Sequence, residues 1–143
     1  LGTLYGPVDR YISYYNGLAY SLDGKTLAAA SNYSNVDLWD LSTGNIARKL
    51  SHNVGRVFSV AYSPDGKTLA SASSFIVLWD AASGSEIRRI KEQGEAKRIS
   101  SIAFTPDGRT LVSGGDDGAI KVWEVSSGKL LRTLAPSSGL MIP

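Results

Sequence analysis

The sequence contains no cysteine and a single histidine, and none of its apolar runs is longer than a β-strand. Without cysteine, neither a disulfide framework nor a thiolate metal site can form, and the compartment stays open with a slight preference for the cytoplasm. The short apolar runs are far below the length of a membrane-spanning helix, and the first residues lack the pattern of a signal peptide.

The net charge is also small, and the sequence lacks helical periodicity. The formal charge is +2 over 143 residues, which is too small to indicate nucleic-acid binding. The 3.6-residue apolar period of a helix is missing throughout, because turn signals interrupt the chain about every 8–12 positions. With 43% hydrophobic content the chain can nevertheless bury a sizeable core. These features predict an all-β fold.

One stretch of turn and strand residues occurs three times. The copies are SLDGKTLA at 21–28, SPDGKTLA at 63–70 and TPDGRTLV at 105–112, so each begins 42 residues after the one before. VDLWD, IVLWD and IKVWE follow at 36–40, 76–80 and 120–124, and a glycine lies five residues after each tryptophan, at Gly44, Gly84 and Gly128. A period of this length indicates a solenoid, a propeller or another repeat array.

Each repeat predicts a meander of four short strands. In VFSVAYSPDGKTLASAS (57–73), two apolar runs flank Pro-Asp-Gly, the signature of a hairpin turn. A third strand is expected from Phe75 to Trp79 and a fourth from Glu86 to Ile90. Only the fourth strand carries charge, as an outer edge strand should. Such sheets, small and apolar inside and charged outside, are typical of propeller blades packed face to face.

This pattern resembles the WD-repeat family of β-propellers. The resemblance covers about residues 16–134 and is carried by Trp39-Asp40, Trp79-Asp80 and the variant Trp123-Glu124, all in register with the hairpin turns. It implies a circular scaffold that binds proteins or peptides and very rarely catalyses a reaction. The expected fold is therefore a β-propeller segment with three complete four-stranded blades and partial strands on either side.

The expected boundaries follow the repeats. Blades are predicted at 16–51, 52–91 and 92–134, while 1–15 is expected to hold the tail of a preceding outer strand and a tyrosine-rich loop. Residues 135–143 are interpreted as the start of a next blade or a linker. Ring closure is then expected from further blades of a longer chain or from homo-oligomerisation, since an uncovered blade would expose an apolar face.

The resemblance also implies a buried hydrogen-bonded set in each repeat: a loop histidine, a hydroxyl residue in the second strand, an aspartate in the turn before the third, and the tryptophan. The second repeat has His52, Ser71 and Trp79; the third has Ser113, Asp117 and Trp123; the first has Trp39, with Ala29 in the serine position. No repeat is complete, so apolar packing is expected to contribute more than this network, and His52 is interpreted as structural.

Other polar groupings are interpreted as turns. Asp23, Asp65 and Asp107 each lie in their own hairpin, and Asp116-Asp117 beside Gly118 is another turn rather than a metal pair. No Gly-x-Ser-x-Gly nucleophile turn accompanies the histidine. The sequence therefore predicts no catalytic residue, no cofactor and no metal site.

Two segments have features that the repeat pattern does not explain, and they are candidate partner surfaces. The segment 5–17 is rich in tyrosine, which is favoured at interfaces, and Tyr11, Tyr14 and Tyr15 are the candidates there. The basic segment 88–98 offers Arg98. The alternatives are that the tyrosines fill the gap between blades and that the basic residues form a solvated outer strand.

The functional hypothesis is a non-catalytic scaffold that binds a protein or peptide through blade-connecting loops. The alternatives are the propeller domain of a larger enzyme or regulatory protein and a self-assembling structural repeat module. An enzyme would be expected to place His, Asp or Glu on the inner strands, whereas these strands carry mostly Ala, Ser, Leu and Val.

Overall fold

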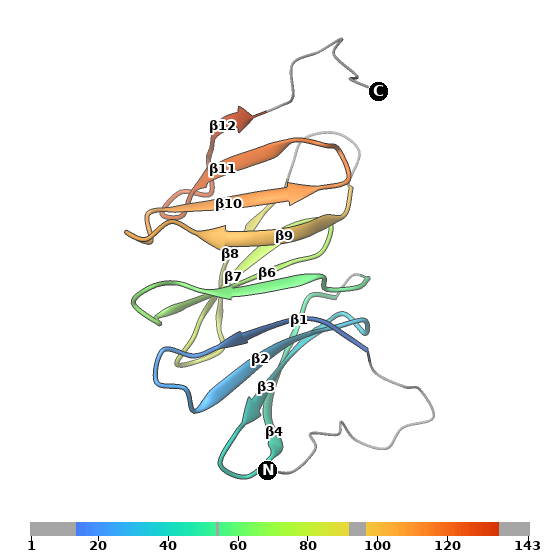
Figure 1. The fold of residues 1–143 in the computed structure, drawn as a ribbon, viewed down its shortest axis with the longest axis vertical. Coiled ribbons are helices and arrows are strands. Elements are labelled where there is room, and N and C mark those ends of the chain that lie inside the picture. The colour runs from blue at the N-terminus through green and yellow to red at the C-terminus, as the bar shows by residue number, and fades with distance from the viewer. Residues whose placement is uncertain (1–13, 54, 92–96, 135–143) are drawn as a thin grey trace, which may run out of the picture.

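The computed structural model describes residues 14–53, 55–91 and 97–134, and in these ranges the fold is all β. Three four-stranded antiparallel sheets are stacked one on another (Figure 1). The first contains β1 (Tyr15–Tyr20), β2 (Thr26–Ser31), β3 (Asn35–Asp40) and β4 (Asn45–Ser51); the second β5 (Ser59–Tyr62), β6 (Thr68–Ala72), β7 (Ile76–Asp80) and β8 (Glu86–Ile90); the third β9 (Ile99–Phe104), β10 (Thr110–Gly115), β11 (Ile120–Glu124) and β12 (Leu130–Leu134).

The four-stranded meanders are thus confirmed. β8 has the expected bounds, and the third strand of the second sheet begins one residue later than expected, because Phe75 still belongs to the turn. The partial strands expected within 1–15 and 135–143 fall largely outside the described residues.

The Asp-Gly hairpins form because each aspartate caps its own turn. Asp65 Oδ1 accepts hydrogen bonds from the hydroxyl of Ser63 and from the backbone N–H of Lys67, at 2.6 and 3.0 Å. Gly66 follows with a φ of 73°, a left-handed conformation that favours glycine. Asp23 and Asp107 make the same pair of bonds in their turns. The repeated eight-residue stretch is therefore a repeated hairpin.

The sheets pack through their first strands, with β5 lying between β1 and β9. One core cluster fills the space between the first and second sheets, including Ala28, Val36, Leu69 and Val77. A second cluster fills the space between the second and third sheets, including Ala70, Ile76 and Leu111. The middle sheet is consequently apolar on both faces, as the sequence predicts.

The three tryptophans are buried and occupy equivalent positions. Trp39, Trp79 and Trp123 are 2%, 5% and 3% exposed. Trp79 packs in the cluster between the first and second sheets, and Trp123 in the cluster between the second and third. All three tryptophans are therefore buried, and packing between two sheets is described for Trp79 and Trp123.

An arginine on each of the first two outer strands reaches the next sheet. Arg48 Nη1 donates to the carbonyl of Ala82 at 3.4 Å, and Arg88 Nη1 donates to that of Ser127 at 2.7 Å. Each arginine side chain also lies against the glycine of the turn to which it donates. A Cβ added at Gly84 would come within 2.5 Å of the Arg48 side chain, and one added at Gly128 would come within 2.8 Å of the Arg88 side chain. Gly84 and Gly128 therefore allow close packing of these arginines and also adopt a positive φ.

The outward faces of the first and third sheets expose apolar side chains that the repeat elsewhere buries. Leu18 is 62% exposed, whereas its equivalents Val60 and Ile102 are buried. On the other side Ile120 is 47% exposed, whereas Ile76 is fully buried. The expectation that an uncovered blade would expose an apolar face agrees with this arrangement.

Replacement of Trp79 by alanine tests the importance of packing between the sheets. We expect a loss of about 3–5 kcal/mol in the free energy of unfolding, because a large buried side chain leaves a cavity in the core. Urea denaturation followed by circular dichroism measures it. Ile87→Ala, at an exposed position of the outer strand β8, is the control and should change little. A Trp79 variant as stable as the unmodified chain would contradict this role.

Candidate functional site

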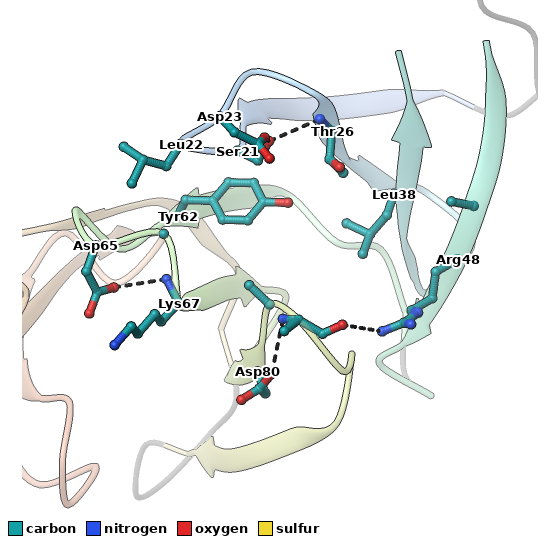
Figure 2. A pocket seen from close by; sticks show the side chains of 14 residues that line it. Ser21, Leu22, Asp23, Thr26, Leu38, Arg48, Tyr62, Asp65, Lys67 and Asp80 are labelled. Carbon is teal, nitrogen blue, oxygen red and sulfur yellow. Dashed lines mark hydrogen bonds between the residues drawn. The ribbon is translucent and has the colours of Figure 1, made fainter. Parts of the chain in front are cut away.

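A groove of about 790 Å³ lies between the first and second sheets (Figure 2). It opens at the end of the sheets where the Asp-Gly hairpins and the Trp-Asp turns lie. Its lining residues are Ser21, Leu22, Asp23, Thr26, Leu38, Ala47, Arg48, Tyr62, Asp65, Gly66, Lys67, Asp80, Ala81 and Ala82.

The interior of the groove is apolar, with an aromatic ring at its centre. Figure 2 shows the Tyr62 ring lying across the groove, with its hydroxyl directed toward Leu38. Ala47, Ala81 and Ala82 add small side chains to the wall, and Leu22 stands at the mouth, 73% exposed. The pKa of Tyr62 is raised, first by burial and then by the negative charge of Asp23.

The rim carries three carboxylates, each held by its own turn. Asp23 and Asp65 accept the hairpin bonds, and Asp80 Oδ1 accepts the backbone N–H groups of Ala82 and Ser83, at 3.1 and 2.9 Å. These hydrogen bonds hold the pKa of all three below the usual range of a carboxyl group. The rim is therefore anionic at neutral pH.

The corresponding positions of the second and third sheets line two smaller cavities, of about 470 and 580 Å³. Counted from the aligned tryptophans, Ile87 and Val125 correspond to Ala47 and Ala81; Val125 lines both cavities, and Ile87, on β8, is 51% exposed. Counted from the aligned hairpins, Phe104 stands in the place of Tyr62. Two larger aliphatic side chains and the loss of a hydroxyl thus distinguish these positions from those of the groove.

A buried hydrogen-bonded chain links His52, Ser71 and Trp79 in the second repeat, as the resemblance implies. The Trp79 indole N–H donates to Ser71 Oγ at 2.8 Å, and Ser71 Oγ lies 2.5 Å from His52 Nε2. Because the Ser73 hydroxyl donates to the carbonyl of Phe75, Ser73 Oγ accepts from His52 Nδ1–H, and Nε2 therefore accepts from the Ser71 hydroxyl. Burial, followed by the charge of Arg89, lowers the pKa of His52 to about 4, so the ring is neutral.

The first repeat satisfies its tryptophan differently. Ala29 offers no hydroxyl, and the Trp39 side chain hydrogen-bonds the hydroxyl of Tyr15, whose ring it meets edge-on at 6.3 Å. That hydroxyl in turn donates to Asp37 Oδ2 at 2.8 Å. Asp37 is buried and its Oδ1 has no partner. Burial and the Asp37 hydrogen bond raise the pKa of Tyr15.

The third repeat uses its serine without a histidine. The Trp123 indole N–H donates to Ser113 Oγ at 2.9 Å. Asp117, in the turn before β11, accepts from the backbone of Ala119 and from Lys121 Nζ at 2.7 Å. Asp40 accepts turn hydrogen bonds from Ser42, as Asp80 does from its own turn. The residues predicted for the structural motif therefore lie in turns and in the buried networks.

The residues predicted for a partner surface lie at the other end of the sheets. Tyr14 is 62% exposed. Tyr15 is half-buried in the first sheet, with its hydroxyl on Asp37. Arg98 is exposed, pairs with Asp116 and lies 5.1 Å over the Phe58 ring. Tyr11 lies outside the described residues. A partner contact for these residues stays a prediction.

No group of three or more potential metal ligands occurs within 14–53, 55–91 and 97–134, and the same residues include no helix able to cross a membrane. The three carboxylates at the groove, Asp23, Asp65 and Asp80, are instead held by turns. The groove offers shape, apolar surface and charge rather than a catalytic constellation.

Comparison with models of protein families identifies the family to which the repeats belong. The family model described as WD domain, G-beta repeat, matches residues 44–80 and 84–124. The chain belongs to the WD40 repeat family. A search of curated proteins gave no match.

Each WD40 match straddles two sheets. Residues 44–80 comprise the outer strand β4 of the first sheet and β5–β7 of the second, and 84–124 comprise β8 and β9–β11. The repeat of the sequence is therefore out of phase with the sheet, so that each repeat links neighbouring blades. The groove between the first and second sheets lies at such a junction.

The neutral, buried His52 makes stability depend on pH. Its pKa is about 4 in the folded chain and about 6.5 when unfolded, so the unfolded state binds the extra proton between these values. The contribution of the neutral His52 to the free energy of unfolding is fully present above about pH 6.5. It should fall by about 3 kcal/mol as the pH drops to about 4. Urea titrations at intervals of pH measure the slope.

His52→Gln is the matched variant, since it removes the titrating ring. It should lose the slope in this window while keeping the loss of stability below about pH 4 that comes from the turn aspartates. A slope that persists unchanged in His52→Gln would contradict the assignment.

The Tyr15 hydroxyl is predicted to stabilise the buried carboxylate of Asp37. Tyr15→Phe should cost about 1–3 kcal/mol, because Asp37 would then lose its hydrogen bond in a buried site. The equivalent of Asp37 in the second sheet is Val77, so Asp37→Val is the natural partner variant. In that background Tyr15→Phe should cost much less, and equal costs in both backgrounds of a double-mutant cycle would rule out the coupling.

Proposed function

We propose that this chain is a non-catalytic scaffold that binds a segment of a partner protein in the groove between the first and second sheets. WD40 domains commonly mediate protein interactions. The observation that carries the proposal is that this groove is one continuous cavity of about 790 Å³, whereas the corresponding positions of the next repeat line two smaller cavities, of about 470 and 580 Å³. Grooves with an apolar wall and a few polar groups are usual ligand sites.

The lining supports a peptide rather than a small substrate. The groove is open along its length and has a strongly exposed leucine, Leu22, at the mouth. Exposed apolar side chains beside a groove are typical of protein contacts. The carboxylates are each engaged by a turn, which supports a binding role over acid–base chemistry.

We propose a second contact surface at the opposite end of the sheets, with Tyr14 and Arg98 as its anchors. Both residues are exposed and lie where the first strand of a sheet begins, whereas the groove lies where that strand ends. The two surfaces are therefore separate, and substitutions can be made in one without altering the other.

Filling the groove tests the proposal. Ala47→Ile with Ala81→Val introduces the side chains that the next repeat carries at these positions, so the fold has precedent for both. Peptides selected from a random phage-displayed library on the immobilised chain should lose at least about tenfold in affinity for this variant. Tyr14→Ala is the control and should leave their affinity unchanged. Peptides that bind the filled variant as tightly as the unmodified chain would overturn the groove as the site.

A further inference from the structure

The first and third sheets form the two ends of the stack (Figure 1). At each junction inside the stack, the first strand of one sheet packs on the sheet before it: β5 contacts β1 and β2, and β9 contacts β5 and β6. β1 is the equivalent strand of the first sheet, and β9 and β10 are the equivalents of β5 and β6 in the third. Within the residues that the structure describes, one end of the stack therefore presents a first strand with no sheet before it, and the other presents a sheet face with no strand after it.

The end formed by the first sheet exposes two large side chains of β1. Leu18 and Tyr20 are 62% and 68% exposed. Their equivalents on β5, Val60 and Tyr62, pack in the core between the first and second sheets. Trp39, on β3 and on the same face as Leu18, is buried. The open part of this face is therefore the part along β1, which is the strand position that forms the junctions inside the stack.

The end formed by the third sheet exposes aliphatic side chains of β11 and β12. Ile120 and Leu134 are 47% and 41% exposed. Counted from the aligned tryptophans, their equivalents in the middle sheet are Ile76 and Ile90, which are buried in the core between the second and third sheets. This end therefore carries the kind of surface on which a first strand packs at the junction before it.

Each end also carries one half of a polar contact that the junctions inside the stack complete. Arg48 and Arg88, nine residues after their tryptophans, each donate to a carbonyl in the turn before the outer strand of the next sheet. Arg132 is the third member of this series, is exposed, and has no acceptor among the described residues. In the equivalent turn of the first sheet, between β3 and β4, Ser42 and Thr43 are exposed and receive no arginine from the described part of the chain.

We propose that copies of this chain associate head to tail, with β1 of one copy packed on the third sheet of another. Leu18 and Tyr20 of the one copy then cover the face that carries Ile120 in the other. Arg132 donates to a carbonyl of the turn between β3 and β4 of the partner copy. The inference goes beyond the proposed function and does not depend on it, because none of these residues lines the groove.

A second copy fits both ends because each end supplies what the other requires. The new junction continues the interface that already joins the sheets, with the same strand position, the same apolar positions and the same arginine. A two-fold dimer would instead place a face against its own copy, which would bring Arg132 to another third sheet rather than to the acceptor turn. A head-to-tail contact repeats until the copies close into a ring or extend as a filament.

Light scattering on the purified chain tests the association, and the mass should rise with concentration in whole multiples of the monomer. Leu18→Glu and Ile120→Glu each place an unpaired carboxylate in one half of the junction, so each alone should weaken association by at least about tenfold. Ile87→Glu, at an exposed position of the middle sheet, is the control and should associate as the unmodified chain does. Circular dichroism checks that the three variants stay folded, as their exposure in the single chain leads us to expect.

Mixing the two end variants decides the geometry. Leu18→Glu keeps an intact third sheet and Ile120→Glu keeps an intact β1, so together they have one competent junction. Fluorescently labelled Leu18→Glu should bind unlabelled Ile120→Glu in a one-to-one complex that grows no further, and should not bind unlabelled Leu18→Glu. A two-fold contact predicts that only one of the substitutions matters.

Three results would overturn the inference. They are an unmodified chain that stays monomeric at every concentration, association that only one of the two end substitutions weakens, and a mixture of the end variants that forms no complex. None of them bears on peptide binding in the groove, which is measured with other substitutions.

Discussion

An apolar sheet face in this chain is buried where another sheet covers it. The middle sheet shows the constraint most clearly, because Leu69 and Ile76 are both fully buried although they face different neighbours. The close approach that this requires explains the alanines at the centre of β2 and β6 and the glycines over which Arg48 and Arg88 lie. Hydrogen bonding within a sheet determines its strand order, whereas packing between sheets determines which side chains each strand can carry.

Within that packing, the polar demands of the repeat are met in three ways. Each tryptophan brings a buried indole N–H that requires an acceptor. The second and third sheets supply a serine from the adjacent strand, and the first supplies the hydroxyl of Tyr15 on β1, two strands away from Trp39. Only the second sheet adds a histidine beyond its serine. The tryptophan and its packing are thus constant, while the acceptor and its own partners vary.

The sequence predicts the parts of the fold that depend on local chemistry and on period. Hairpins capped by Asp65 and its equivalents, four-stranded meanders and buried tryptophans follow from turn residues and alternation, and the structure confirms them. Tyr15 could not be assigned in this way, because its aromatic surface suits an interface as well as an interior. Its role depends on Asp37, which is 22 residues away and adjoins it only through the strand pairing.

The sequence does not predict the groove, for a related reason. Ala47 and Ala81 are unremarkable in isolation, since small residues are common in this chain, and they lie on different strands and turns of different sheets. Only alignment of the repeats shows that larger residues, Ile87 and Val125, stand in the same places at the next junction. The scaffold tolerates both because the affected side chains border the open end of the junction rather than its core. Two side chains at the edge of a junction between sheets can therefore be smaller while the core of that junction stays packed. In this way a repeat with packed junctions acquires a groove with its own chemistry.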